Sequence, residues 1–230
     1  MILRYLIQST LWGFFMAALL FVPAGTLDWP GAWVFLIEMT VGGVGLMVWL
    51  GRHDPALLAE RMKSPIQREQ KGWDKLFMGG FVLLWLGWLA FMGFDHGGFD
   101  HGGPDHAAMP VWLEALGGLG LPIAIYGGYL TFRENSFAAP VVKIQAARGQ
   151  TVISTGPYSH VRHPMYAGAL FYLVGMPLLL GSWHGLIFSP FLILLLAGRT
   201  VMEERTLRAE LAGYDAYAAR VRYRLIPHVW

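Results

Sequence analysis

Residues 156–168 read GPYSHVRHPMYAG, and they place turn-forming, polar and ionisable residues directly before an apolar run. The apolar run covers 165–181, and residues 181–183, Gly-Ser-Trp, predict a tight turn into a second apolar run. Pro164 suits the first position of a helix, where its missing N–H is not needed. The stretch therefore predicts two membrane helices joined as a hairpin, which brings their polar ends together on one side of the membrane.

The whole chain has the composition of a membrane protein. Of its 230 residues, 55% are hydrophobic and 14% are charged, and the mean hydropathy is +0.46. A soluble domain averages about 25% charged residues. Six segments approach or reach the ~20 apolar residues that a bilayer-spanning helix needs; they are 5–22, 31–50, 76–94, 111–131, 165–181 and 184–201. We therefore expect an all-α, polytopic integral membrane protein with about six transmembrane helices. The absence of cysteine excludes disulfides and thiolate chemistry.

The basic residues set the expected orientation. All seventeen Lys and Arg fall on one side of the six spans, and the loops on the other side carry only the acidic residues Asp28, Asp95, Asp100 and Asp105. By the positive-inside rule, both termini are expected in the cytoplasm. The lack of long extensions favours a bacterial inner-membrane protein. The basic residues are spread among helix ends and acidic residues, which favours anionic lipids over nucleic acid as partners.

The chain divides into two expected parts. Residues 1–131 hold four spans, rich in Leu, Trp, Phe and Gly, and are expected to form a transmembrane scaffold. Residues 132–230 are expected to form a cofactor-binding core, made of the helical hairpin, a cytosolic pocket and a C-terminal cytosolic helix over 202–220.

Two features outside the hairpin leave alternatives open. Residues 95–106 contain three Asp-His pairs at a spacing of five, which fits either a divalent metal site or an exterior loop. The glycines between the pairs favour the loop, because they oppose a preorganised site. Glu38 lies inside the second span, where a carboxylate is by default a candidate functional group. It can equally make a polar contact between helices or stay protonated.

The hairpin brings chemically useful side chains together. His163, Tyr166, Arg199 and Glu203 are expected at one membrane depth, and Arg199 and Glu203 share a helix face because they are four residues apart. Arginine can clamp a carboxylate or phosphate, and tyrosine rings offer flat surfaces to an aromatic ring or a sulfonium. The alternative is that these charges only anchor helix ends at the headgroups. Their concentration in one patch favours a site for a nucleotide-like cofactor that bears both charge signs.

The run GPYSHVRHPMYAG, the hairpin, EERTL at 203–207, YDAY at 214–217 and RVRYRLIP at 220–227 together resemble the isoprenylcysteine carboxyl methyltransferase family. The resemblance covers about 143–230. It implies an integral membrane methyltransferase that binds S-adenosylmethionine in a cytosolic pocket. The residues that would line this pocket are Gln145, Gln150, Thr151, Val152, Ile153, Tyr158, His163, Pro164, Met165, Tyr166 and Glu203. Arg199 falls where the family places an arginine that engages the methyl-accepting carboxylate, and the expected catalytic residues are Arg199, Glu203 and His163.

The resemblance also implies a lipidic or prenylated acceptor, either a small molecule or a protein. A carboxylate acceptor is ionised at neutral pH and needs no general base. A lipid amine needs one, and His163 or Glu204 can serve. Two other classes stay open. A membrane sterol or enone reductase that uses NADPH shares a similar Arg-His-Pro-x-Tyr hairpin, but it needs further basic contacts for the 2′-phosphate. A non-catalytic metal or lipid sensor would use the Asp-His loop instead.

Overall fold

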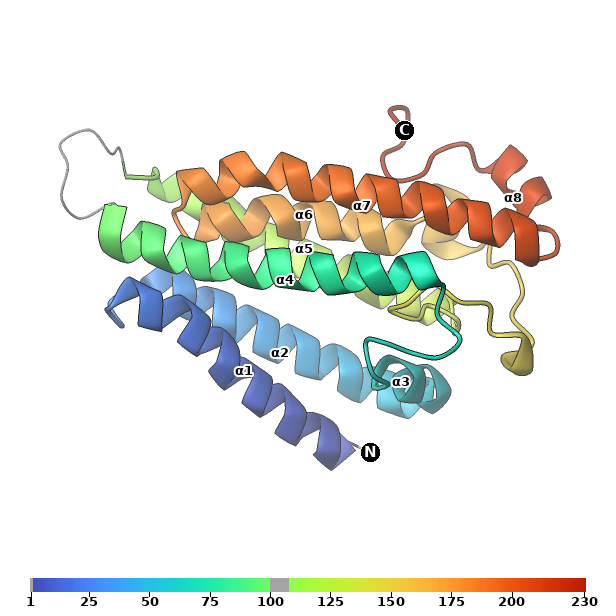
Figure 1. Ribbon diagram of the computed structural model, residues 1–230, viewed down its shortest axis with the longest axis horizontal. Coiled ribbons are helices and arrows are strands. Elements are labelled where there is room, and N and C mark those ends of the chain that lie inside the picture. Colours follow the sequence, from blue (N-terminus) through green and yellow to red (C-terminus); the bar gives the residue numbers. More distant parts are fainter. Residues whose placement is uncertain (1, 100–107) are drawn as a thin grey trace.

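The computed structural model describes residues 2–99 and 108–230, and these ranges consist of helices joined by turns and loops (Figure 1). The α-helices are α1 Ile2–Ala24, α2 Pro30–His53, α3 Pro55–Arg61, α4 Gly72–Phe94, α5 Val111–Glu134, α6 Pro164–Leu179, α7 Trp183–Glu210 and α8 Tyr214–Arg220. Three short helical turns complete the elements: η1 Asp95–Phe99, η2 Ala146–Arg148 and η3 Gly156–Ser159.

Five helices, α1, α2, α4, α5 and α7, are long and apolar enough to cross a membrane. The fifth apolar segment, 165–181, forms α6, which has 16 residues and is shorter than the ~20 of a typical span. These five helices and α6 correspond one by one to the six apolar segments of the sequence. The prediction of an all-α, polytopic membrane protein is therefore confirmed.

The C-terminal hairpin of α6 and α7 turns tightly. Gly181 has a φ of +71°, in the left-handed region that favours glycine. The hydroxyl of Ser182 accepts the N–H of Gly185 at 2.9 Å and so caps the start of α7. Farther along the hairpin, the Ser189 hydroxyl donates to the carbonyl of Leu173 at 2.7 Å. These contacts hold α7 beside α6, as Figure 1 shows.

α5 packs along the other side of α6, and the two helices approach closely. A Cβ at Gly117 would collide with the α6 backbone at Leu179, so only glycine permits this approach. The main apolar core lies between α1, α2, α4, α6 and α7, where Leu20, Leu89 and Met176 are fully buried. The helices therefore form one packed bundle that fixes the position of the hairpin.

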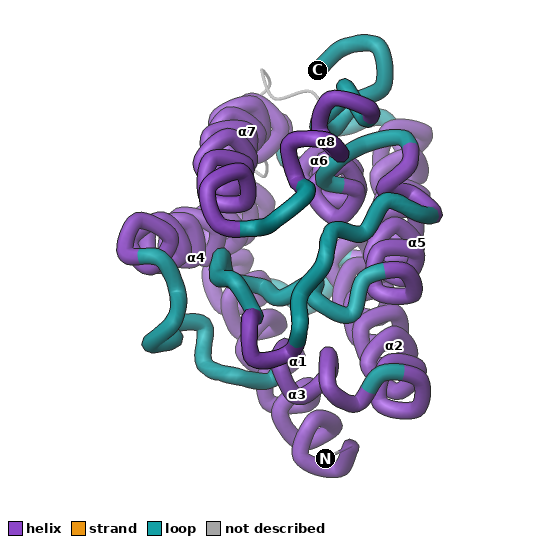
Figure 2. Tube along the Cα trace, turned by 90° about the vertical axis from the view of Figure 1, so that its right-hand side faces the viewer, coloured by secondary structure: helices purple, strands orange, loops and turns teal. Residues whose placement is uncertain are grey.

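α3 and α8 lie at the same end of the bundle, which we call the pocket end (Figures 1 and 2). The predicted helix over 202–220 is wrong in one respect, because α7 ends at Glu210 and a new helix, α8, begins at Tyr214. Gly213, with a φ of +84°, makes the turn. Figure 2 looks onto this end and shows the loops between α5 and α6 crossing it.

Two polar features of the sequence lie away from the pocket end. Glu38 lines a groove between α2 and α5, and its buried Oε2 has no hydrogen-bond partner among the described residues. Asp95, the first residue of η1, accepts hydrogen bonds from Ser182 at 2.5 Å and His184 at 2.8 Å, which ties η1 to the hairpin turn. Residues 100–106 of the Asp-His repeat lie outside the described residues. Within the described ranges, no group of three or more acidic or histidine side chains is placed to hold a metal.

Candidate active site

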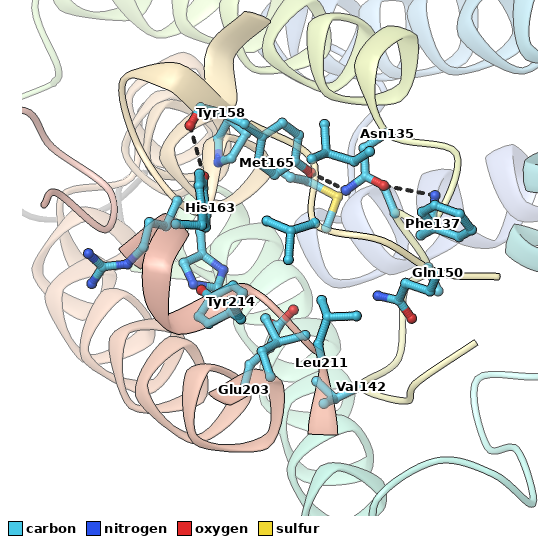
Figure 3. A pocket seen from close by; sticks show the side chains of 18 of the residues that line it. Asn135, Phe137, Val142, Gln150, Tyr158, His163, Met165, Glu203, Leu211 and Tyr214 are labelled. Atoms are coloured by element: carbon cyan, nitrogen blue, oxygen red, sulfur yellow. Dashed lines mark hydrogen bonds between the residues drawn. The ribbon is translucent and has the colours of Figure 1, made fainter. Parts of the chain in front are cut away.

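A polar cavity of about 100 Å³ lies at the pocket end, between the loops that follow α5 and the facing ends of α6, α7 and α8. Figure 3 shows Gln150, His163, Glu203 and Tyr214 around it. Its walls combine aromatic rings, aliphatic side chains and a few ionisable groups. The lining residues are Asn135, Phe137, Ala138, Ala139, Val141, Val142, Lys143, Gln150, Thr151, Val152, Ile153, Tyr158, Arg162, His163, Pro164, Met165, Tyr166, Glu203, Leu207, Leu211, Tyr214 and Tyr217.

The hydroxyl of Tyr166 joins the two helices of the hairpin. It donates to Oε2 of Glu203 at 2.6 Å and accepts a hydrogen bond from Nη1 of Arg199. Tyr166 and Arg199 are 7% and 5% exposed, so both groups act in an environment of low polarity. The structure thus brings Tyr166 of α6 together with Arg199 and Glu203 of α7, which lie more than 30 residues farther along the chain.

Asp74, near the start of α4, anchors Arg199. Its Oδ1 accepts Nε of Arg199 at 2.9 Å, and its Oδ2 accepts the Gln70 amide at 2.9 Å and the Val142 N–H at 2.8 Å. The third guanidinium nitrogen of Arg199 donates to the carbonyl of Pro140 at 2.9 Å. Asp74 is completely buried and therefore couples the hairpin to the loop that lines the cavity. Sequence reasoning missed it, because a lone acid at the start of an apolar segment resembles an ordinary interface anchor.

Glu204 lies next to Glu203 but serves a different contact. Two nitrogens of the Arg162 guanidinium donate hydrogen bonds to the Glu204 carboxylate, at 2.5 Å and 3.2 Å, and Nε of Arg224 donates another at 3.0 Å. His163 adds a contact of 3.3 Å through Nε2. Glu204 does not line the cavity, so its position does not fit the predicted role of a general base for an amine acceptor. It instead holds the C-terminal tail against the start of α6.

His163 links this cluster to the cavity. Its ring stacks on the ring of Tyr166, with centroids 5.5 Å apart and planes at 2°. The backbone N–H of His163 donates to the backbone carbonyl of Arg224 at 3.0 Å, which pairs the segment before α6 with the C-terminal tail. His163 lines the cavity, as do its neighbours Pro164 and Met165.

Three tyrosines form one wall of the cavity. Asn135 donates to the Tyr158 hydroxyl at 2.7 Å, and the Tyr217 hydroxyl donates to the Tyr158 carbonyl at 2.8 Å (Figure 3). The buried Tyr214 hydroxyl has no hydrogen-bond partner among the described residues. Burial raises the pKa of Tyr217 to about 12 and raises the pKa values of Tyr158 and Tyr214 further. All three phenols therefore stay neutral at physiological pH and keep a proton to donate.

The loop opposite the tyrosines offers backbone groups. Thr151, Val152 and Ile153 line the cavity, and their backbone N–H and C=O groups make no hydrogen bond within the described ranges. Gln150 also lines the cavity. The predicted contact Gln145 does not, because its amide donates to the Phe137 carbonyl at 2.8 Å and accepts from Arg148. Gln145 shapes the loop from behind.

A second cavity, which we call the interhelix cavity, lies between α4, α6 and α7 and measures about 340 Å³. Met165 and Tyr166 line both cavities, whereas Arg199 lines only the interhelix cavity. Its remaining walls are almost entirely apolar: Phe77, Met78, Phe81, Val82, Trp85, Pro140, Ala169, Tyr172, Leu173 and Leu196. The side chains of Tyr166 and Arg199 therefore stand at the junction of a polar space and an apolar one.

These features define the class of protein: a helical integral membrane protein with a polar site at one end of its bundle, next to an apolar cavity. Residues 135–209 match the model of the isoprenylcysteine carboxyl methyltransferase (ICMT) family. The matched segment runs from the loops of the polar cavity to the end of α7. The match confirms the resemblance seen in the sequence over this segment, and it supports an assignment to that methyltransferase family.

Proposed function

We propose that this protein transfers a methyl group from S-adenosylmethionine to a lipidic or prenylated carboxylate acceptor at the membrane surface. The proposal is carried by one observation: Tyr166, Arg199 and Glu203 meet where the polar cavity adjoins the apolar one. A polar cofactor and a lipid-tailed acceptor thus have adjacent sites. The family match supports a methyltransferase.

The residues of the polar cavity fit this cofactor. The free backbone groups at 151–153 suit the edge of a purine, and Glu203 suits ribose hydroxyls or a cation. The Tyr214 hydroxyl lines the cavity without a hydrogen-bond partner among the described residues, so it can donate to an acceptor atom of the ligand. The cavity is smaller than the roughly 300–1,000 Å³ of typical ligand sites, so binding requires side chains to move apart. When bound, the cofactor supplies a methyl group on a cationic sulfur, which passes to the acceptor oxygen and leaves a neutral thioether.

The acceptor site follows from Arg199. Its three described hydrogen bonds use three of the five N–H groups of a guanidinium, which leaves donors for an acceptor carboxylate. Such a carboxylate is ionised at neutral pH and needs no base. Asp74, Tyr166 and Pro140 fix the guanidinium plane, so its remaining N–H groups point in a defined direction. The protein then acts mainly by positioning and by excluding water. For a lipid amine acceptor, His163 is the cavity residue able to take the proton.

The pocket end faces the cytosol in this proposal. The loops there carry the basic residues of the chain, as the positive-inside rule expects for the cytoplasmic side of a bacterial inner membrane. The lipid tail of the acceptor lies in the interhelix cavity, among apolar side chains of α4, α6 and α7. The carboxylate at its head reaches Arg199 at the level of the polar cavity.

Calorimetric titration with S-adenosylhomocysteine tests the cofactor assignment, with NADPH as the competing ligand. We expect binding of S-adenosylhomocysteine, a loss of at least tenfold in Glu203→Gln, and unchanged binding in Glu210→Gln. Glu210 is the matched control, because it lies on the same helix, pairs with Lys71 at 2.7 Å and does not line the cavity. Binding of NADPH in place of S-adenosylhomocysteine would overturn the proposal. Mass spectrometry of membranes labelled with an isotopic methyl donor then identifies the acceptor.

A further inference from the structure

A third cavity, which we call the lower cavity, is lined by residues of α1, α2, α4 and α6 and measures about 230 Å³. Trp12, Met16, Phe35 and Met39 contribute to its walls. Among the residues that the structure describes, two line both the lower and the interhelix cavity: Trp85 of α4 and Tyr172 of α6. These two side chains therefore form the partition between the two spaces.

The partition is supported by other rings. The centroids of Trp85 and Tyr172 are 6.4 Å apart. Trp12 stacks on Trp85 at 6.4 Å with planes at 9°, and Phe35 approaches Tyr172 at 6.4 Å. Both supporting residues line the lower cavity. The two rings of the partition are thus held from the lower side.

The partition lies at a defined depth. Tyr172 follows Tyr166 by six residues on α6, which corresponds to about 9 Å along the helix axis. An apolar tail whose head is held at Arg199 therefore extends for a limited distance before it meets the two rings. Beyond that depth, the tail must bend back or displace Trp85.

We propose that the Trp85–Tyr172 pair is the floor of the acceptor site and sets the longest tail that the enzyme accepts. This inference rests on the proposed function, because it places the acceptor tail in the interhelix cavity. Each methylene that enters an apolar site is worth about fourfold in affinity. Methylenes beyond the floor add no affinity, because they do not enter the interhelix cavity. The increase in affinity with chain length therefore stops when the tail reaches the Trp85–Tyr172 pair.

The test uses a series of N-acetyl-S-alkylcysteines, whose chains lengthen by a methylene pair at each step, with protein in nanodiscs. For the unaltered protein, we expect kcat/KM to rise about 15-fold per step and then to level off. In Trp85→Ala we expect the interhelix and lower cavities to join, so that kcat/KM continues to rise over further pairs of methylenes. Trp85→Phe keeps a ring in place and is expected to keep the original limit. Trp112→Ala is the matched control, because Trp112 is 63% exposed and lines neither cavity.

Binding of the same series, measured by calorimetry, separates the two proposals. An unchanged length limit in Trp85→Ala, with S-adenosylhomocysteine binding and short-chain binding intact, overturns the floor. A limit that shifts in binding, without methylation of any acceptor, supports the floor and counts against the proposed reaction. If Trp85→Ala fails to fold, Trp85→Leu gives the same test with a smaller loss of volume.

Discussion

Asp74→Asn removes the negative charge that compensates Arg199. Asp74 receives hydrogen bonds from Arg199, Gln70 and the Val142 N–H, and it is completely buried. Asparagine has nearly the same shape, but one carboxylate oxygen becomes an amide nitrogen that cannot accept a hydrogen bond. The guanidinium of Arg199 then stays buried without its counter-charge, which typically costs about 3–5 kcal/mol. At about 2–4 °C per kcal/mol for a chain of this size, we expect Tm to fall by roughly 6–20 °C.

Thermal unfolding in detergent measures this loss, and a double-mutant cycle tests its cause. Arg199→Met removes the charge that Asp74 compensates. If the two residues act as a pair, the double variant retains about 0.5–3 kcal/mol more stability than the two single losses predict. Glu69→Gln is the control, because the Glu69 side chain is 76% exposed. Strict additivity of Asp74→Asn and Arg199→Met would refute the pairing, and so would a control variant as unstable as Asp74→Asn.

Four further predictions concern single positions. Tyr214→Phe is expected to weaken S-adenosylhomocysteine binding about 3–10-fold by calorimetry without lowering Tm, because its hydroxyl lacks a protein partner; equal binding would show that the ligand does not use it. Glu204→Gln is expected to lose about 3–5 kcal/mol of stability, since it leaves Arg162 uncompensated, and a change below 1 kcal/mol would contradict this role. Gly117→Val is expected to lose at least about 1–3 kcal/mol through collision with α6, and an unchanged Tm would show that the helices can separate there.

The fourth concerns pH and Glu60. Burial alone would raise the pKa of this carboxyl, but Lys143 and Lys63, at 2.5 Å and 2.6 Å, hold the pKa below its ordinary 4.5. The two ion pairs of Glu60 therefore stabilise the fold above pH 4.5, and this contribution is lost as the pH falls through the lower folded-state pKa of Glu60. Tm measured from pH 6 downwards should fall less steeply in Glu60→Gln, and parallel curves would contradict the assignment.

The sequence predicted the parts of the fold that depend on local pattern. Apolar segments of spanning length gave the six long helices, and Gly181 marked the hairpin turn. The spacing of four residues predicted that Arg199 and Glu203 share a helix face, and both contact the Tyr166 hydroxyl. The break between α7 and α8 was missed, because the run from 202 to 220 has helical character throughout and only Gly213 signals the turn.

The polar partners of the site were harder to predict, because they depend on contacts between distant parts of the chain. Asp74 lies outside the segment that matches the family model, and its bond to Arg199 joins positions 125 residues apart. Gln145 was expected to contact the cofactor, but its carbonyl and amide are both bonded within the loop. Whether a polar side chain faces a cavity or its own loop follows from tertiary packing, and residue type alone does not reveal it.

The neighbouring residues Glu203 and Glu204 show how one local pattern can serve two purposes. Successive residues on an α-helix are rotated by about 100°, so the side chains of adjacent glutamates leave the helix in different directions. Glu203 faces Tyr166 and the polar cavity, where its bond from one hydroxyl leaves room for a ligand. Glu204 faces Arg162 and Arg224, which occupy both of its oxygens. The second glutamate fixes the tail and the start of α6, and this fixed frame determines where the first one points.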